Sequence, residues 1–183
     1  MTHCRKLPWI GKNIYFLGFM ASGKSRIGSA FAHLLGWPFH DTDELIEEYA
    51  GKKISEIFEH DGEEAFRHIE TQVIENVSNM KNNVIALGGG AVVREQNWQL
   101  ISNSGITIRL AAPVHVLSER IARNQDRPLM ANLSETERIK KIEAMLKTRE
   151  PYYRRAQFTF ESSDDMPVAD FIRHIYAILL ERL

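Results

Sequence analysis

The segment Gly18-Phe19-Met20-Ala21-Ser22-Gly23-Lys24-Ser25 constrains the fold of this 183-residue chain more than any other feature. It directly follows the apolar run 14–17 and directly precedes a stretch with helical spacing, 26–35. The pattern G-x-x-x-x-G-K-[ST] between a strand and a helix is typical of a phosphate-binding loop. Its glycines let successive backbone N–H groups face one concavity, and the positive end of the following helix adds to that field. The sequence therefore predicts a nucleotide site.

Within this loop, Lys24 is expected to reach the β- and γ-phosphates, and the Ser25 hydroxyl to ligate Mg²⁺. The alternative is a flexible turn whose lysine lies on the surface, and the strand and helix on either side speak against it. The residues expected to bind the nucleotide from this segment are Gly18, Ala21, Ser22, Gly23, Lys24, Ser25 and Arg26.

Composition narrows the class of partner. A net charge of -1 gives no electrostatic footprint for nucleic acid or an anionic membrane. The single cysteine, Cys4, excludes an internal disulfide and suits a reducing cytoplasm. Residues 1–12 lack the apolar core of a signal peptide and are expected to be an N-terminal extension. No apolar run approaches the ~18 residues of a membrane helix. A cytoplasmic monomer without nucleic-acid or membrane partners is expected.

Strands and helices are expected to alternate along the whole chain. Strands are predicted at 13–17, 38–40, 84–87, 106–110 and 158–160. Helices are predicted at 24–35, from 44, at 54–80 with a break at Asp61-Gly62, at 95–102, 113–124 and 134–149, and from 167. This order indicates one α/β domain, residues 1–183, with a parallel sheet. The polar stretch 124–133 is expected to be a lid.

Ligands of an open parallel sheet bind at the carboxyl ends of its strands, and Asp41 and Asp43 follow the second predicted strand there. Phosphoryl transfer needs one carboxylate near Mg²⁺ and another near the attacking hydroxyl. The third predicted strand ends without an acid, so Asp41 is expected to serve the Mg²⁺ through water. The alternative for either aspartate is a helix N-cap.

Three consecutive glycines, Gly88, Gly89 and Gly90, follow the third predicted strand. They offer no side chain, so we expect their backbone N–H groups to meet a closely approaching ligand, whereas a plain turn is the alternative. Arg67 has two interpretations of equal weight. It can pair on the helix surface with Glu63 or Glu70, or it can bind a carboxylate of the ligand with two parallel bonds.

Three further arginines are candidates for binding phosphates or substrate: Arg120, Arg127 and Arg149. Arg127 lies in the expected lid, where a guanidinium can close over the transferred phosphoryl group. The residues alone also allow each of them to be a solvated surface charge. The seven histidines show no metal-binding spacing, so no structural zinc is expected.

Taken together, these segments resemble the shikimate kinase family. The resemblance runs from about Asn13 to the C-terminus. Its elements occur in order as Gly18–Ser25, Asp41-Thr42-Asp43, Phe66-Arg67-His68-Ile69-Glu70, Leu87-Gly88-Gly89-Gly90, Arg127-Pro128-Leu129 and Arg149-Glu150-Pro151-Tyr152-Tyr153. It implies a three-layer kinase fold with a five-stranded parallel sheet in the order 2-3-1-4-5 and a lid. It also implies transfer of the ATP γ-phosphoryl group to the 3-hydroxyl of shikimate, with Mg²⁺.

By this resemblance, Asp43 contacts the substrate hydroxyls and can accept the reacting proton, while Lys24 and Arg127 act with it in catalysis. The shikimate carboxylate is expected between Arg67 and Arg149, beside the backbone of Gly88, Gly89 and Gly90. Arg120 is expected near adenine. A small carboxylate with three hydroxyls needs a cation and a hydroxyl-binding carboxylate on opposite sides, which favours the ligand-binding interpretation of Arg67.

One residue departs from the family's pattern: Ala21 stands where the family often has glycine, and it should fit if its φ stays negative. The nearest alternative function is a gluconate-type sugar-acid kinase. A regulatory GTPase would need an Asn-Lys-x-Asp segment, which Asn124-Gln125-Asp126 does not match. A nucleotide-binding scaffold without chemistry is a third alternative, and the intact candidate residues argue against it.

Overall fold

A computed structural model describes residues 7–123, 130, 133–162 and 165–183. The strands are β1 (Asn13–Leu17), β2 (Phe39–Asp41), β3 (Val84–Ala86), β4 (Gly105–Ala111) and β5 (Phe158–Glu161). The helices are α1 (Lys24–Leu35), α2 (Thr42–Ala50), α3 (Ile54–His60), α4 (Gly62–Ser78), α5 (Glu95–Ser104), α6 (Val114–Ala122), α7 (Glu135–Tyr153) and α8 (Val168–Arg182), with a short 3₁₀ helix, η1, at Ala91–Val93.

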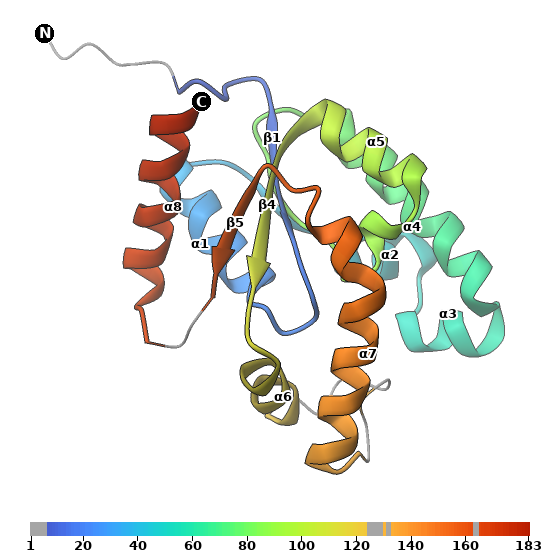
Figure 1. Cartoon of the computed structure of the whole chain (residues 1–183). Coiled ribbons are helices and arrows are strands. Elements are labelled where there is room, and N and C mark those ends of the chain that lie inside the picture. The colour runs from blue at the N-terminus through green and yellow to red at the C-terminus, as the bar shows by residue number, and fades with distance from the viewer. Residues whose placement is uncertain (1–6, 124–129, 131–132, 163–164) are drawn as a thin grey trace, which may run out of the picture.

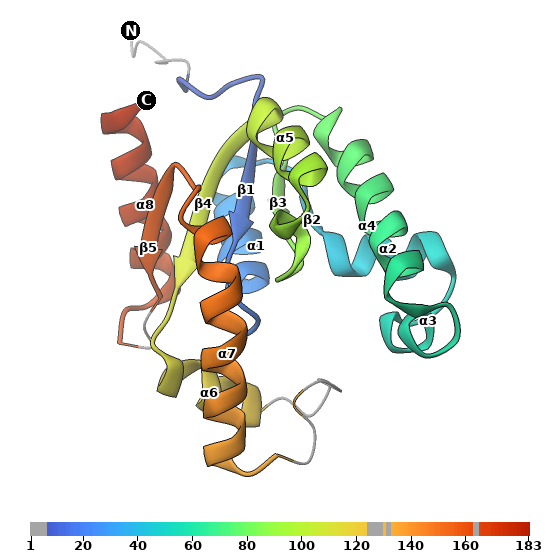
Figure 2. The same ribbon diagram turned by 45° about the vertical axis from the view of Figure 1, so that its right-hand side comes forward.

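All five strands are parallel and lie in the order β2-β3-β1-β4-β5 (Figure 2). This confirms the expected sheet order. The central strand β1 is buried along its whole length because helices cover both faces of the sheet. Strand β1 leads into the phosphate loop, so that loop emerges at the middle of the sheet's carboxyl edge, next to the end of β3.

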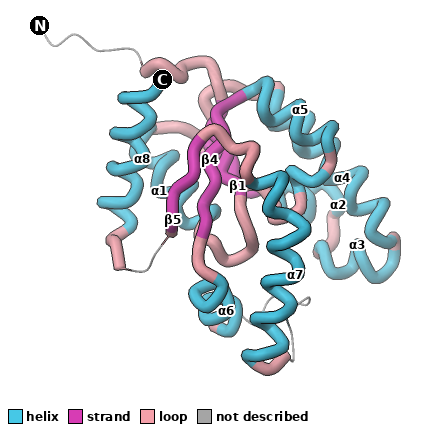
Figure 3. Tube along the Cα trace, in the orientation of Figure 1, coloured by secondary structure: helices cyan, strands magenta, loops and turns pink. Residues whose placement is uncertain are grey.

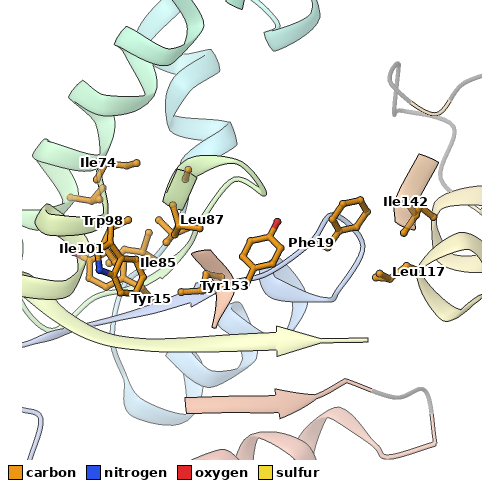
Figure 4. Close-up of a cluster of buried hydrophobic side chains, with 14 of the residues drawn as sticks. Tyr15, Phe19, Ile74, Ile85, Leu87, Trp98, Ile101, Leu117, Ile142 and Tyr153 are labelled. Atoms are coloured by element: carbon orange, nitrogen blue, oxygen red, sulfur yellow. The ribbon is translucent and has the colours of Figure 1, made fainter. Parts of the chain in front are cut away.

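Alternate residues of β1 face two separate hydrophobic layers. Tyr15 and Leu17 pack with α4, α5, α6 and α7, a cluster that Figure 4 shows from Tyr15 across to Leu117. Ile14 and Phe16 pack with α1 and α8 on the opposite face. Figure 1 shows α8 on one side of the strands and α4 and α5 on the other. A third cluster joins α2, α3 and α4 beyond the β2 edge.

The carboxyl ends of β4 and β5 face the end of the molecule at which α6 and α7 lie, as the arrows in Figure 1 and the tube in Figure 3 show. The loops that follow β1 and β3 open toward the same end, since the strands are parallel. The expected site residues are thereby brought to one edge. Among the described residues, no helix is long and apolar enough to cross a bilayer.

The structure differs from the expected elements at several places, and three of these differences adjoin the site. The helix expected to end at about residue 149 continues to Tyr153, although Pro151 lies inside it. Pro151 is in the last turn and removes only one backbone donor, while the buried Tyr153 packs into the core. The turn after the glycine triplet forms η1, which the sequence did not predict. Strand β2 includes Asp41, one residue past its expected end. The predicted break at Asp61-Gly62 is confirmed.

Candidate active site at the carboxyl edge of the sheet

The phosphate loop takes its shape from backbone angles that favour glycine. Gly18 has φ of +140° and Gly23 has φ of +96°, directly before α1. A Cβ on Gly18 would overlap the carbonyl oxygen of Leu110, at the end of β4. Gly18 is therefore required both by its φ and by the close approach of β4. The loop lies against the neighbouring strand end and leads directly into the N-terminus of α1.

The expectation for Ala21 is wrong. Its φ is +60°, in the left-handed region, rather than negative. A side chain in this region costs roughly 1–2 kcal/mol relative to glycine because Cβ crowds the following carbonyl. The Ala21 carbonyl accepts a hydrogen bond from Arg120 Nη1 at 3.2 Å, and the same nitrogen donates to Ser162 Oγ at 3.2 Å. Arg120 thus ties the strained part of the loop to the end of β5.

Lys24, Ser25 and Asp41 lie where a nucleotide's phosphates and a metal ion would be needed. Lys24 Nζ donates to the carbonyls of Gly18 and Phe19, at 3.0 and 2.9 Å, so its ammonium lies over the loop. Ser25 Oγ donates to Asp41 Oδ2 at 2.5 Å. A hydroxyl and a carboxylate that converge beside a phosphate loop are the hard oxygen donors that suit Mg²⁺. The donor set therefore fits this metal.

Asp41 makes the helix N-cap that the sequence left as one alternative, and its other carboxylate oxygen contacts Ser25. Its Oδ1 accepts the backbone N–H of Asp43 at 3.0 Å and so caps α2, while its Oδ2 accepts the Ser25 hydroxyl. The side chain of Thr42, fully buried between the two aspartates, accepts the N–H of Gly88 at 2.8 Å. This bond fixes the end of β2 against the end of β3. Thr42 had no role in the sequence analysis.

A pocket of about 520 Å³ opens beside the phosphate loop. This volume is within the range of small-molecule and cofactor sites. It is lined by cationic side chains and an apolar wall: Ala21, Gly23, Arg26, Ile27, Arg120, Arg123, Ser162, Met166, Pro167, Val168 and Phe171. Arginines beside an apolar wall suit the anionic and aromatic parts of a nucleotide. Arg26 and Arg120 both line this pocket beside the phosphate loop.

Each glycine of the triplet lies against one charged side chain. A Cβ on Gly88 would lie 2.6 Å from Asp43 Oδ1, and one on Gly90 would lie 2.9 Å from Arg67 Nη1. At Gly89 the nearest atoms to a Cβ are Arg149 Nη1 and the backbone nitrogen of Met20, both at 3.5 Å. The triplet thus brings an aspartate and two arginines from three elements to the edge of the phosphate loop.

The expected use of the triplet's N–H groups needs correction at Gly88, because its N–H already donates to Thr42. None of the three glycines has a positive φ. What the triplet supplies at these positions is the absence of Cβ atoms, which lets charged side chains approach the backbone. The Gly89 carbonyl also contributes, since it accepts hydrogen bonds from Arg149 Nη1 at 3.3 Å and from the Tyr153 hydroxyl at 2.5 Å.

Arg67 makes both ion pairs that its helical spacing allows. Its guanidinium donates to Glu70 Oε2 at 2.9 Å and to Glu63 Oε1 at 3.2 Å. Glu70 is only 1% exposed, so this is no surface pair. Burial raises the pKa of Glu70, with Arg67 acting against that rise and Asp43 adding to it. Burial lowers the pKa of Arg67, but the nearby carboxylates of Glu70 and Glu63 outweigh this effect, so the pKa is raised. The guanidinium is therefore held in place beside Gly90.

Arg149 reaches the site from α7. Its guanidinium lies 5.9 Å from the centroid of the Phe19 ring, in the phosphate loop, and contacts the Gly89 carbonyl. The same helix is fixed to β4, where Arg109 donates two bonds to Glu150, at 3.0 and 2.7 Å. Arg149 therefore contacts both the phosphate loop and the glycine triplet.

Of the site residues predicted from the sequence, those within the described part of the chain all lie at this edge of the sheet. Arg127 lies outside the described residues, as does most of the expected lid, 124–133. The residues that sequence reasoning missed are Thr42, Ser162 and Tyr153, together with the burial of Glu70. Thr42 and Tyr153 belong to the family segments Asp41-Thr42-Asp43 and Arg149-Glu150-Pro151-Tyr152-Tyr153. Their presence in those segments was the only sequence sign that they adjoin the site. Nothing in the local sequence marks Ser162, since it meets Arg120 only through the tertiary fold.

The chain is similar to known proteins over most of its length. A family model described as shikimate kinase matches residues 20–180. The chain is 42% identical over 153 residues to the shikimate kinase of Caldanaerobacter subterraneus subsp. tengcongensis, covering 84% of this chain and 88% of that protein.

Among solved structures, the shikimate kinase from Acinetobacter baumannii in complex with shikimate matches with a TM-score of 0.85. It is 35% identical, and the match covers 93% of each chain. A gluconokinase from Sinorhizobium meliloti 1021 matches with a TM-score of 0.59 at 17% identity over 94% of this chain and 93% of that one. At 17% identity the likeness to the gluconokinase extends to the fold alone. The comparisons therefore favour the shikimate kinase family over the sugar-acid kinase alternative.

Proposed function

This chain belongs to the shikimate kinase family, and from that membership we propose how it transfers the ATP γ-phosphoryl group to the 3-hydroxyl of shikimate. The products are shikimate 3-phosphate and ADP. The observation that carries the proposal is the convergence of Asp43, Arg149 and Arg67 on three successive glycines beside the phosphate loop. This arrangement offers two cations and one carboxylate to a small acidic polyol.

On the donor side, the loop N–H groups and Lys24 would bind the β- and γ-phosphates, while the purine would occupy the pocket that Arg120 and Arg26 line. Lys24 would exchange its loop carbonyls for phosphate oxygens. Ser25 and Asp41 would hold Mg²⁺, Asp41 through a water molecule. When bound, this ion neutralises charge on the phosphates.

On the acceptor side, Arg67 and Arg149 would bind the substrate carboxylate. A guanidinium suits a carboxylate because its planar donors match both oxygens. The Glu70 pair holds Arg67 against Gly90, so the cation is oriented before substrate arrives. Asp43, on the far side of the triplet, would accept hydrogen bonds from the ring hydroxyls. The carboxylate clamp and the hydroxyl-binding group would then fix the ring between them.

In the reaction, a bond forms between the substrate 3-oxygen and the γ-phosphorus, and the bond from that phosphorus to the β–γ bridging oxygen breaks. The hydroxyl proton goes to the Asp43 carboxylate. Positioning and charge stabilisation supply most of the catalysis in such transfers. Lys24 would stabilise the charge that develops on the transferred group. Arg127 would do the same from the lid, a role that rests on the resemblance alone.

All the proposed residues come from one chain, so a monomer would contain a complete site. The use of ATP and the single cysteine, Cys4, suit action in the cytoplasm.

The experiment is a coupled assay of ADP release with ATP, Mg²⁺ and shikimate, alongside gluconate as the competing acceptor. Shikimate should stimulate ADP release far above the substrate-free rate, and gluconate should not. An absence of shikimate stimulation contradicts the proposal.

The clamp is tested with Arg67→Lys, which keeps a charge beside the buried Glu70. Loss of the fork should raise KM for shikimate by roughly tenfold or more, because charge-assisted hydrogen bonds contribute about 1.5–3 kcal/mol. KM for ATP should stay near the wild-type value. Arg173→Lys, on α8 and paired with Asp170, is the matched control. An unchanged KM for shikimate in Arg67→Lys would refute the clamp.

A further inference from the structure

The Gly89 carbonyl is the meeting point of two donors from one helix. Arg149 and Tyr153 stand one turn apart on α7, and both donate to this oxygen, Tyr153 at 2.5 Å and Arg149 at 3.3 Å. The phenol therefore makes the shorter bond. The arginine's bond is near the limit of hydrogen-bond length. A carbonyl oxygen has two lone pairs, so it can accept both donors at once.

Tyr153 is held in this place by packing on all sides. It is 1% exposed and belongs to the same buried cluster as Leu87, at the end of β3, and Phe19, in the phosphate loop (Figure 4). The Arg109 guanidinium lies 5.8 Å from its ring centroid. Because Arg109 is also bound to Glu150, the last turns of α7 are fixed to β4. The hydroxyl thus has little freedom to leave Gly89.

The Tyr153 hydroxyl also stays a donor across the pH range in which kinases are assayed. Burial raises its pKa above the usual value near 10, and the lowering effects of Arg149 and Arg109 are smaller. A neutral phenol can donate its proton to a carbonyl, whereas a phenolate cannot.

We propose that Tyr153 is a positioning residue for Arg149 in shikimate binding, because it satisfies the Gly89 carbonyl and leaves the guanidinium available to the substrate carboxylate. This inference rests on the proposed function. The Gly89 carbonyl is partly buried, and a partly buried acceptor that is left without a donor loses free energy. With the phenol in place, Arg149 can turn from Gly89 to the substrate without that cost. Without the phenol, Gly89 would compete with the substrate for the guanidinium.

The test is Tyr153→Phe, which keeps the ring in its cluster and removes only the hydroxyl. Tyr152→Phe removes the neighbouring hydroxyl and serves as the matched control. We expect KM for shikimate, and its Kd from calorimetry without nucleotide, to rise roughly three- to tenfold in Tyr153→Phe, as the loss of one hydrogen bond predicts. KM for ATP and the melting temperature should stay close to wild type, and Tyr152→Phe should leave all four quantities unchanged.

Two results would overturn the inference while wild-type activity with shikimate stands. One is an unchanged KM and Kd for shikimate in Tyr153→Phe. The other is an equal rise in the KM values of both substrates together with a lowered melting temperature, since that indicates general loosening. Failure of the proposed function would look different, because wild type itself would then show no shikimate-dependent ADP release.

A second measurement asks whether Tyr153 acts through Arg149. In an Arg149→Ala background, the change Tyr153→Phe should have no further effect on shikimate Kd, because the group that it positions is gone. A full additional three- to tenfold loss in that background would contradict the inference.

Discussion

The phosphate loop and the glycine triplet lie next to each other at the carboxyl edge of the sheet, and they use glycine for different reasons. In the loop, Gly18 and Gly23 have φ values of +140° and +96°, so the backbone path itself needs them. In the triplet no φ is positive, and the missing Cβ atoms of Gly88 and Gly90 instead give room to Asp43 and Arg67. The donor half is built from backbone conformation, and the acceptor half from charged side chains.

This difference predicts a separation of effects. In the loop, a Cβ on Gly18 would meet the backbone of Leu110, which cannot move aside, so substitution there should cost stability. In the triplet, a Cβ on Gly88 or Gly90 would meet the flexible ends of Asp43 or Arg67, which can shift at little cost to the fold, so substitutions there should cost substrate recognition or rate.

The largest expected effect on stability is that of Gly18→Ala. Its Cβ would meet the Leu110 carbonyl at a strained φ, so the free energy of unfolding should fall by roughly 3 kcal/mol. For a chain of this size that lowers the melting temperature by about 6–12 °C. Gly36→Ala is the control, since Gly36 has φ of +66° with open space around it. Equal losses in the two variants would contradict a role for the Leu110 contact.

Gly88→Ala should instead act on the rate. Its Cβ would displace the Asp43 carboxylate, which lies 2.6 Å away, and a displaced reacting group can lower kcat on the order of 10²-fold. The melting temperature should change little. Gly89→Ala is the control, because its Cβ would meet neighbours at an ordinary 3.5 Å and should lower kcat far less. If both variants lost kcat equally, the glycines would be needed for some common reason, and the separate contacts would not explain them.

Ala21→Gly is a substitution in the phosphate loop that should make the protein more stable. Removing Cβ from a left-handed residue should raise the free energy of unfolding by about 1 kcal/mol. Thermal denaturation should then show a melting temperature about 2–4 °C higher. A lower melting temperature would mean that the added freedom of glycine in the unfolded chain outweighs the strain.

The smallest effect concerns the helix that carries Arg149. Burial alone would raise the pKa of Glu150, but hydrogen bonds from Arg109 and Arg154 hold it below its usual 4.5. A lowered folded-state pKa adds stability above the unfolded-state pKa, and this stability is lost as the pH falls through the folded value. Wild type should therefore be more stable than Glu150→Gln near neutral pH. That difference should shrink below about pH 4.5 in denaturant titrations, and a constant difference would argue against the ion pair.

Much of the fold followed from local patterns. The strand order came with the family resemblance, and the strands and most helix ends came from apolar runs and caps. The last turn of α7 was not predicted, because the contacts that hold Tyr153 there come from Gly89 and from Arg109 on β4, far away in the sequence. The 3₁₀ helix at Ala91–Val93 has no periodic signal of its own.

The site was predicted by residue type better than by conformation. Asp43, Arg67 and Arg149 lie at the triplet as expected, but the sequence could not show that Glu70 is buried beneath Arg67. It also could not give the φ of Ala21, since the packing of the loop against Arg120 and β4 sets that angle. Thr42 and Tyr153 became visible only as contacts to Gly88 and Gly89, residues more than forty positions away.

The most direct measurement is a crystal structure of the protein with ADP and shikimate bound. The account predicts that the substrate carboxylate lies within about 2.7–3.2 Å of guanidinium nitrogens of both Arg67 and Arg149, with a ring hydroxyl on the Asp43 carboxylate. The Tyr153 hydroxyl should remain on the Gly89 carbonyl. A shikimate carboxylate that contacts neither arginine, or a ring turned away from Asp43, would contradict the account of the acceptor site.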